Sequence, residues 1–189
     1  MSYKLNLETD LLVIGGGPGG YVAAIYGAKM GLNVILVESG KLGGTCLNVG
    51  CIPTKTLVKS SELHKDLINA ADFGIKVKGN IEVDMAAIID RKDEIKDRLV
   101  SGIEFLMKKN KIKVLYGHGS FIDEDKVVVK GEEELVVAFK NVIIATGSKI
   151  SNIKIPGIDL PCVMTSTDAV KSKELPKSIT IVGGGGIGM

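Results

Sequence analysis

The sequence predicts an α/β fold, in which a parallel β-sheet is flanked by helices and extended by a small antiparallel β-meander. Two observations carry this prediction. Residues 10–38 read as a strand, a glycine turn, a helix and a second strand, which is the order of a βαβ unit with two parallel strands. Residues 111–140 hold short β-rich runs separated by turn residues, which is typical of antiparallel strands.

The βαβ unit carries a glycine pattern with a chemical meaning. The strand DLLVIG runs into Gly15, Gly17 and Gly20, which have G-x-G-x-x-G spacing. In a Rossmann-like fold the first glycine permits the tight turn, the second lets the backbone approach a pyrophosphate, and the third allows close helix–strand packing. The N–H groups that open the helix then face the phosphate.

The second strand, NVILVE, ends in an acid, Glu38, where a carboxylate can accept a hydrogen bond from a ribose hydroxyl. The flanking strand, the helix and this acid favour a dinucleotide site over a plain glycine turn. The motif alone does not choose between NAD and FAD.

The rest of the chain predicts two helices and further strands. Helical spacing covers residues 53–71 and 85–110, with Asp84 as the expected N-cap of the second helix. Short strands are expected in residues 112–121, 126–130 and 135–148. These three strands should form the meander and return to the sheet.

The end of the chain repeats the opening theme. A predicted strand in LPKSITIVGGGGIGM precedes Gly183, Gly185 and Gly188, again with G-x-G-x-x-G spacing. We therefore expect a piece of a longer protein. A dinucleotide-binding domain would cover residues 1–150 and a connector residues 151–177, and a second, truncated dinucleotide-binding domain would start in residues 178–189. The alternative is a terminal loop that only resembles the motif.

Composition limits the class of protein. The chain is 45% hydrophobic and 24% charged, with a net charge of +2, as in an ordinary globular protein. This charge is too small to indicate nucleic acid or an anionic membrane as a partner. No apolar run reaches the roughly 18 residues of a membrane span. The N-terminus lacks the apolar core of a signal peptide, and three cysteines are too few for a secreted disulfide framework, so we expect a cytoplasmic protein.

Two of the three cysteines lie close together in GGTCLNVGCIPTK, residues 43–55. The spacing of Cys46 and Cys51 does not match a C-x2-C zinc knuckle, and Cys162 stands alone. A buried apolar pair would not need the surrounding glycines and proline. A redox pair fits better, because Pro53 suits the first turn of a helix and puts Cys51 at its N-terminus, where the dipole favours a thiolate. Lys55 would share that face.

The two histidines add no motif. His64 and His118 are isolated in the sequence, so we expect neither to be a ligand, and the sequence gives no role to Cys162.

These motifs together resemble those of the flavoprotein disulfide reductases. LLVIGGGPGGYVAA, GGTCLNVGCIPTK, IIATGS and ITIVGGGGIG occur in the order typical of that family and cover nearly the whole chain. The G-G-T-C-x-N-x-G-C-x-P-x-K string is specific to it. Leu47, Ile52 and Thr54 make the string more similar to the dihydrolipoamide dehydrogenases than to glutathione or mercuric reductases.

The resemblance implies roles for matching residues. Cys46 and Cys51 would form the redox-active disulfide, with Cys46 exchanging with dihydrolipoamide and Cys51 facing the flavin beside Lys55. FAD would lie on the first glycine motif with Glu38 on its ribose, and NAD on the second motif. Gly186 stands where the family usually has an aliphatic residue. The cofactor-binding residues implied in this way are Gly15, Gly17, Pro18, Gly19, Gly20, Glu38, Gly44, Thr45, Cys46, Lys55, Gly119, Thr146, Gly147, Ser148, Gly183, Gly185 and Gly188; no metal site is implied.

The resemblance also implies partners and missing parts. The family's enzymes of this kind act on lipoyl-bearing subunits of 2-oxoacid dehydrogenase or glycine cleavage complexes and form homodimers. Their catalytic His–Glu pair lies near the end of the full chain, and neither His64 nor His118 matches it. We therefore expect the 189-residue chain to be inactive by itself. Two alternatives stay open: a sister disulfide reductase with another substrate, or a non-catalytic flavin- or nucleotide-binding module.

Overall fold

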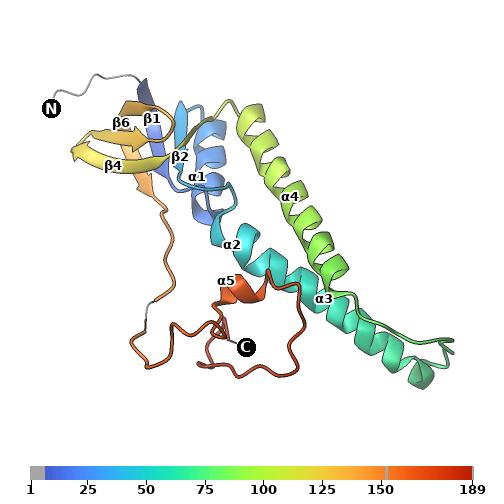
Figure 1. The fold of residues 1–189 in the computed structure, drawn as a ribbon. Coiled ribbons are helices and arrows are strands. Elements are labelled where there is room, and N and C mark those ends of the chain that lie inside the picture. The colour runs from blue at the N-terminus through green and yellow to red at the C-terminus, as the bar shows by residue number, and fades with distance from the viewer. Residues whose placement is uncertain (1–6, 152, 189) are drawn as a thin grey trace. The chain divides into compact units, whose positions relative to one another are not determined.

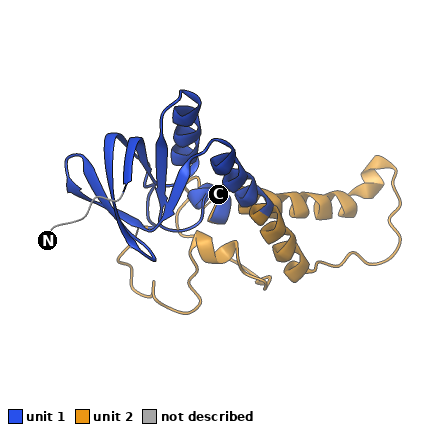
Figure 2. Cartoon of the chain, turned by 90° about the horizontal axis from the view of Figure 1, so that it is seen from above, with its two compact units in different colours: residues 1–48, 98–150 blue, residues 49–97, 151–189 orange. Residues whose placement is uncertain are grey.

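The computed structural model describes residues 7–151 and 153–188. The chain divides into two compact units (Figure 2). Unit 1 comprises residues 1–48 and 98–150, and unit 2 comprises residues 49–97 and 151–189. The expected domain boundaries at residues 150 and 178 stay a prediction.

Unit 1 is built on one six-stranded sheet with the strand order β3-β2-β1-β6-β5-β4 (Figure 1). The central strand β1 pairs in parallel with β2 and β6, and β2 pairs in parallel with β3. The remaining pairs, β4 with β5 and β5 with β6, are antiparallel. The predicted α/β class, with a parallel sheet and a small antiparallel meander, is therefore confirmed. The strands are β1 (Leu7–Ile14), β2 (Val34–Glu38), β3 (Lys113–Tyr116), β4 (His118–Asp123), β5 (Lys126–Lys130) and β6 (Glu134–Ile144).

The first βαβ unit has the form that the sequence predicts. β1 and β2 are adjacent and parallel, with Leu11 opposite Val34. Helix α1 (Pro18–Lys29) connects them, and its buried residues Gly20, Ala24 and Gly27 are all small. A Cβ at Gly27 would lie 2.7 Å from Leu11 Cδ2, so these small side chains let α1 pack closely on the sheet.

The region predicted as one strand over residues 112–121 is two strands. β3 belongs to the parallel part of the sheet, and only β4 belongs to the meander. Gly117 separates them because its N–H donates to the Glu38 carbonyl at 2.8 Å, while a Cβ there would lie 2.6 Å from the Lys130 carbonyl oxygen. The chain therefore pairs with β2 before Gly117 and with β5 after it.

Strand β6 joins the meander to the parallel sheet. Its first residues, Glu134 to Ala138, pair antiparallel with β5. From Val137 onward the same strand pairs in parallel with β1. The meander and the parallel strands therefore form one continuous sheet through β6.

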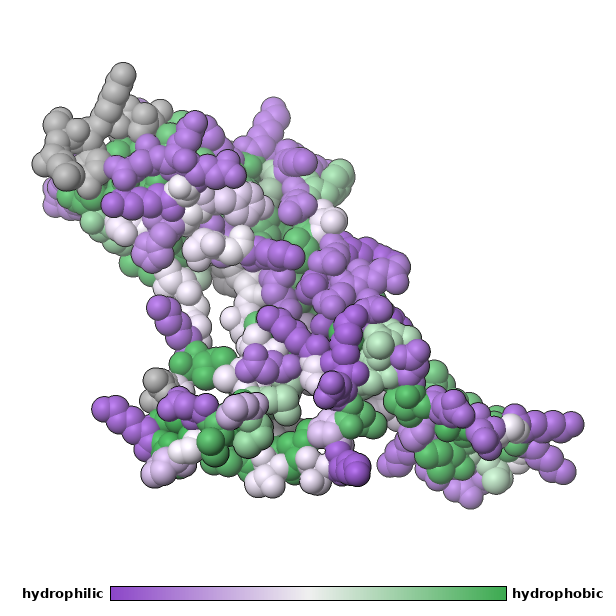
Figure 3. Space-filling view, in the orientation of Figure 1, coloured by the Kyte–Doolittle hydropathy of each residue, from purple (hydrophilic) through white to green (hydrophobic). Residues whose placement is uncertain are grey.

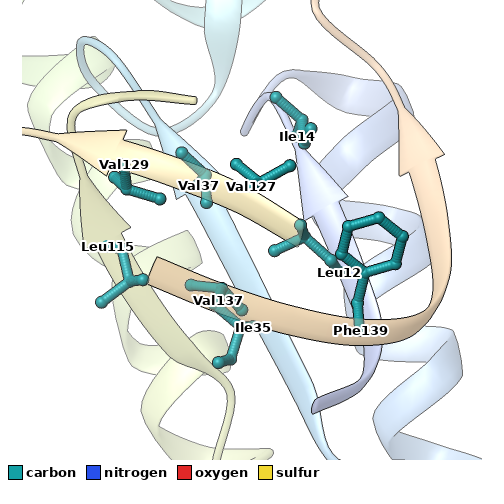
Figure 4. Packing of buried hydrophobic residues seen from close by; sticks show 9 residues of the cluster. All are labelled: Leu12, Ile14, Ile35, Val37, Leu115, Val127, Val129, Val137 and Phe139. Atoms are coloured by element: carbon teal, nitrogen blue, oxygen red, sulfur yellow. The ribbon is translucent and has the colours of Figure 1, made fainter. Parts of the chain in front are cut away.

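The main core of unit 1 forms where the meander meets the parallel strands (Figure 4). Phe121 and Phe139 add an edge-to-face ring contact, with centroids 6.1 Å apart. Ile14 and Val37, at the carboxyl ends of β1 and β2, belong to this core. Its buried members are Leu12, Ile14, Ile35, Val37, Leu115, Val127, Val129, Val137 and Phe139.

The helices after β2 belong to unit 2 or cross its boundary. Asp84 Oδ1 accepts a hydrogen bond from the Ala87 N–H at 2.9 Å, as the predicted N-cap should. The elements are α2 (Gly44–Val49), α3 (Cys51–Ile68), the 3-10 helix η1 (Ala70–Phe73), α4 (Met85–Lys109) and the short α5 (Ser166–Ala169). No helix in the part of the chain that the structure describes combines the length and apolar character that a membrane crossing requires.

The strand predicted before Gly183 is absent from the described chain. Residues 178–182 have no regular structure, and Ile181 and Val182 are 63% and 76% exposed. A β-strand needs a neighbouring strand for its backbone hydrogen bonds, and no described strand pairs with these residues. Residue 189 lies outside the described residues. Apolar side chains are likewise exposed among hydrophilic ones elsewhere on the surface (Figure 3).

Candidate functional site

The glycine turn after β1 is held tightly by the protein itself. Gly15 has a φ of +104°, and a Cβ there would overlap the carbonyl oxygen of Ala145. A Cβ at Gly20 would overlap the carbonyl oxygen of Gly15. Both positions therefore require glycine for reasons of packing, as the motif predicts for the tight turn and for helix–strand contact.

Gly17 differs because the protein leaves space beside it. Its φ is −73°, and a Cβ there would find only the Gly44 Cα, at an ordinary 3.7 Å. Gly17 is the N-cap of α1, Pro18 follows it, and no side chain caps the helix. The first-turn N–H groups thus lack a side-chain acceptor, which is the arrangement that binds a phosphate.

Glu38 is bound to this turn at the end of β2. Its Oε2 accepts from the Gly16 N–H at 2.6 Å and its Oε1 from the Gly40 N–H at 2.7 Å. Each carboxylate oxygen keeps a second lone pair for a hydroxyl donor. These two hydrogen bonds fix the Glu38 carboxylate at the edge of the glycine turn. On the neighbouring strand, burial raises the pKa of Tyr116, and the charges of Glu104 and Glu38 raise it further.

A second glycine turn, at residues 43–44, rests on the first. The Gly43 N–H donates to the Gly16 carbonyl at 2.8 Å. A Cβ at Gly44 would lie 2.6 Å from the Gly17 Cα, so the two backbones touch. Helix α2 starts at Gly44, and this contact puts an exposed Thr45 and a half-buried Cys46 next to the glycine turn after β1.

The segment after β6 closes another side of the turn. The Ala145 N–H donates to the Ile14 carbonyl at 2.7 Å, and Thr146, Gly147 and Ser148 follow with exposed side chains or backbone. A Cβ at Gly119, in β4, would lie 3.4–3.6 Å from side chains at the ends of β1, β2 and β5. Unit 1 thus gathers these predicted residues at the carboxyl ends of parallel strands, where open α/β sheets bind ligands.

The start of α3, in unit 2, has the local structure that the sequence predicts for a reactive cysteine. Cys51 is the first helical residue and is exposed. Pro53 lies in the first turn, and the Thr54 N–H donates to the Gly50 carbonyl at 3.0 Å. No acidic residue or side-chain cap occupies that turn. The first turn of α3 therefore offers Cys51 an exposed position at an uncapped helix N-terminus.

The remaining residues lie on α3, in the last part of unit 2 and on β4. Lys55 is exposed one turn after Cys51. Gly183, Gly185 and Gly188 form a turn in unit 2, in which the Gly188 N–H donates to the Gly185 carbonyl at 2.9 Å. Cys162 is an exposed thiol, His64 is half-buried on α3, and His118 lies 3.4 Å from the Ser120 hydroxyl. Among residues 7–151 and 153–188, no group of His, Cys, Asp or Glu side chains could hold a metal ion.

Sequence reasoning missed one residue of this site. Asn48 bridges the second glycine turn, because its Nδ2 donates to the Leu42 and Gly44 carbonyls, both at 3.0 Å. The signal for it was available. In the string G-G-T-C-x-N-x-G-C the glycines and cysteines received roles, and Asn48 did not.

The comparison with known proteins decides the family. The profile of the pyridine nucleotide-disulphide oxidoreductases matches residues 9–189. This chain belongs to that family.

Individual relatives agree with this assignment. The chain is 44% identical to a dihydrolipoyl dehydrogenase of Acholeplasma laidlawii, over 98% of this chain and 55% of that protein. It is 47% identical to a mitochondrial dihydrolipoyl dehydrogenase of Schizosaccharomyces pombe, over 97% of this chain and 37% of that protein. The chain therefore spans about half, or less, of the length of these family members.

A solved structure of the family has the same fold. The Cu(II) complex of the HOCl-induced flavoprotein disulfide reductase RclA from Escherichia coli superposes with a TM-score of 0.82. It is 32% identical to this chain and matches 97% of it, which corresponds to 38% of the RclA chain.

Proposed function

We propose that this chain is the FAD-binding part of an NAD-dependent dihydrolipoyl dehydrogenase, an oxidoreductase that acts on a sulfur group. The observation that carries the proposal is the contact between the two glycine turns. It sets Cys46, one member of the family's cysteine motif, beside a dinucleotide turn with an uncapped helix and an oriented carboxylate. The relatives named dihydrolipoyl dehydrogenase support the choice of substrate.

The residues of unit 1 fit a flavin dinucleotide. The space beside Gly17 and the free N–H groups of α1 suit the pyrophosphate, and Glu38 suits the ribose hydroxyls. Thr146, Gly147 and Ser148 would line the same ligand. FAD, when bound, carries two electrons from the protein dithiol to NAD. The NAD site would begin at Gly183, Gly185 and Gly188.

The cysteines would do the sulfur chemistry by thiol–disulfide exchange. A substrate thiolate attacks Cys46 of the Cys46–Cys51 disulfide, a mixed disulfide forms, and Cys51 leaves as a thiolate. The second substrate thiolate then attacks the substrate sulfur of the mixed disulfide and releases Cys46. The substrate loses two electrons and two protons and becomes the cyclic disulfide, while the protein disulfide becomes two thiols. Cys51, the leaving group, lies at the uncapped N-terminus of α3.

The same proposal covers the setting of the whole protein. Its partners would be lipoyl-bearing subunits of a 2-oxoacid dehydrogenase or glycine cleavage complex, and it would act as a cytoplasmic homodimer. Co-purification of the full-length protein with a lipoylated subunit, and its mass in solution, would test both statements. The catalytic His–Glu pair would come from residues outside this chain.

Two cysteine variants of the full-length protein test the redox assignment. Cys46→Ser should leave a thiolate beside the oxidised flavin and give a long-wavelength absorbance shoulder without added reductant. Acidification should bleach this shoulder as the thiolate protonates. Cys51→Ser should lack the shoulder even when reduced, and both variants should lose dihydrolipoamide oxidation. The reverse pattern would exchange the two roles, and full activity in both variants would refute the redox proposal.

A second candidate is a sister disulfide reductase, favoured by the structural match to RclA. Oxidation of dihydrolipoamide with NAD by the full-length protein separates the two, since a sister enzyme would prefer glutathione disulfide, mercuric ion or a related disulfide. A non-catalytic flavin module would bind FAD and show no thiol-dependent change in absorbance.

A further inference from the structure

We propose that Asn48 is a positioning residue, which fixes the second glycine turn and thereby the placement of Cys46. The redox role of Cys46 in this inference rests on the proposed function, whereas the contacts of Asn48 come from the structure. Asn48 lies in α2 two residues after Cys46, within unit 1.

The turn at residues 43–44 needs an external constraint. Gly43 and Gly44 have φ values of +97° and +57°, which two successive glycines adopt at the expense of much conformational freedom. Without a constraint such a pair samples many other conformations, and α2 would move with it. The Gly43 N–H bond to Gly16 fixes one side of the turn.

The Asn48 side chain supplies the constraint on the other side. Its Nδ2 has two hydrogens, and both are used, one on the Leu42 carbonyl before the turn and one on the Gly44 carbonyl within it. A carboxylate of the same shape would present oxygen to these two oxygens and repel them. The amide therefore ties the turn to the helix that carries Cys46.

The hold of the Asn48 side chain on the turn depends on its Nδ2 group. The Oδ1 of the same amide is buried and has no hydrogen-bond partner among the described residues, so the two Nδ2 bonds are the polar contacts that tie this side chain to the turn.

The test compares Asn48→Ala and the isosteric Asn48→Asp with a matched control, Asn110→Ala. Asn110 also donates through Nδ2 to a carbonyl four residues earlier, that of Leu106 at 2.8 Å. The readout is the rate at which iodoacetamide alkylates Cys46 in the reduced chain, resolved by peptide mass spectrometry. Cys162, an exposed thiol, is the internal reference, and a urea titration reports stability.

One lost hydrogen bond raises local opening about fivefold, and each Asn48 variant loses two, so both should alkylate at Cys46 roughly 25-fold faster. Asn110→Ala should leave the Cys46 rate unchanged, the Cys162 rate should stay as in the unaltered chain in every variant, and Asn48→Ala should still unfold in one cooperative urea transition.

Three results would overturn the proposal. They are an unchanged Cys46 rate in both variants, a normal rate in Asn48→Asp alone, which would assign the effect to shape, and a loss of folding in Asn48→Ala. Alkylation is measured without FAD. A chain that fails to bind FAD would therefore contradict the proposed function, while the alkylation rates would still test the role of Asn48.

Discussion

Gly17 and Gly20 belong to one motif, and the structure gives them different reasons to be glycine. A methyl group at Gly20 would overlap the Gly15 carbonyl oxygen and lie 2.8 Å from its carbon. A methyl group at Gly17 would touch only the Gly44 Cα, at 3.7 Å. Gly20→Ala should therefore destabilise the chain without any ligand, whereas Gly17→Ala should act only when FAD binds.

The magnitudes follow from these contacts. Alanine in place of a helical glycine gains about 0.5–1 kcal/mol from propensity, while overpacking against backbone costs about 1–3 kcal/mol. Gly20→Ala should lose about 1–2 kcal/mol of unfolding free energy. Gly17 has an extended conformation that alanine adopts freely, so Gly17→Ala should stay within about 0.5 kcal/mol. Its methyl group would fill the pyrophosphate space and weaken FAD binding by roughly tenfold or more, which corresponds to about 1.4 kcal/mol.

Urea unfolding of the apo chain and a flavin fluorescence titration measure the two effects separately. Gly19→Ala is the control for stability, because its Cβ would lie 3.9 Å from the Ala145 Cβ and should not lower the midpoint. Equal urea midpoints for Gly17→Ala and Gly20→Ala would refute the packing argument. Unchanged FAD affinity in Gly17→Ala would refute the placement of the pyrophosphate.

Three further predictions concern charged and titratable groups. The hydrogen bond from the Lys140 ammonium lowers the pKa of the Asp10 carboxyl below 3.8, so its contribution to stability is present above that pH and is lost as pH falls. Asp10→Asn should therefore flatten the loss of stability between about pH 5 and pH 3 in urea titrations. The side chain of Lys92 is 3% exposed and lies 3.0 Å from Asp93, which is 41% exposed. Asp93→Ala should cost about 1–2 kcal/mol in unfolding free energy, less than a fully buried pair would, because it removes the partner of both Lys92 and Lys96. A smaller loss for Lys92→Met would assign the larger share of that cost to the buried Lys92 charge left without this partner. Because burial raises the pKa of Tyr116 above 10.0, the difference spectrum between the unaltered chain and Tyr116→Phe should titrate with a midpoint above pH 10.0.

The sequence predicted correctly those elements whose formation depends on residues close together in the chain. The glycine spacing at residues 15–20 and the apolar runs on either side were enough for the βαβ unit. Pro53 was enough to predict that a helix begins near Cys51, and Asp84 was enough for the start of α4. In each case the deciding atoms lie within a few residues of each other, so the sequence contains the whole argument.

Predictions failed where a distant partner decides. Gly117 divides one expected strand into two because the Glu38 and Lys130 backbones approach it. Residues 178–182 have strand composition and form no strand among the described residues, because composition supplies no hydrogen-bond partner.

The sequence by itself determined the fold class, the two glycine motifs, the cysteine pair and, through them, the resemblance to a family. Only the tertiary structure decided that the turn at Gly44 rests on the turn at Gly17, and that the Asn48 amide donates to the carbonyls of Leu42 and Gly44. It also decided which motif glycine the protein needs for its own packing and which one it leaves open for a ligand. The physical reason is that a motif specifies residue types along the chain, whereas contact and empty space depend on which distant backbones the fold brings within a few ångströms.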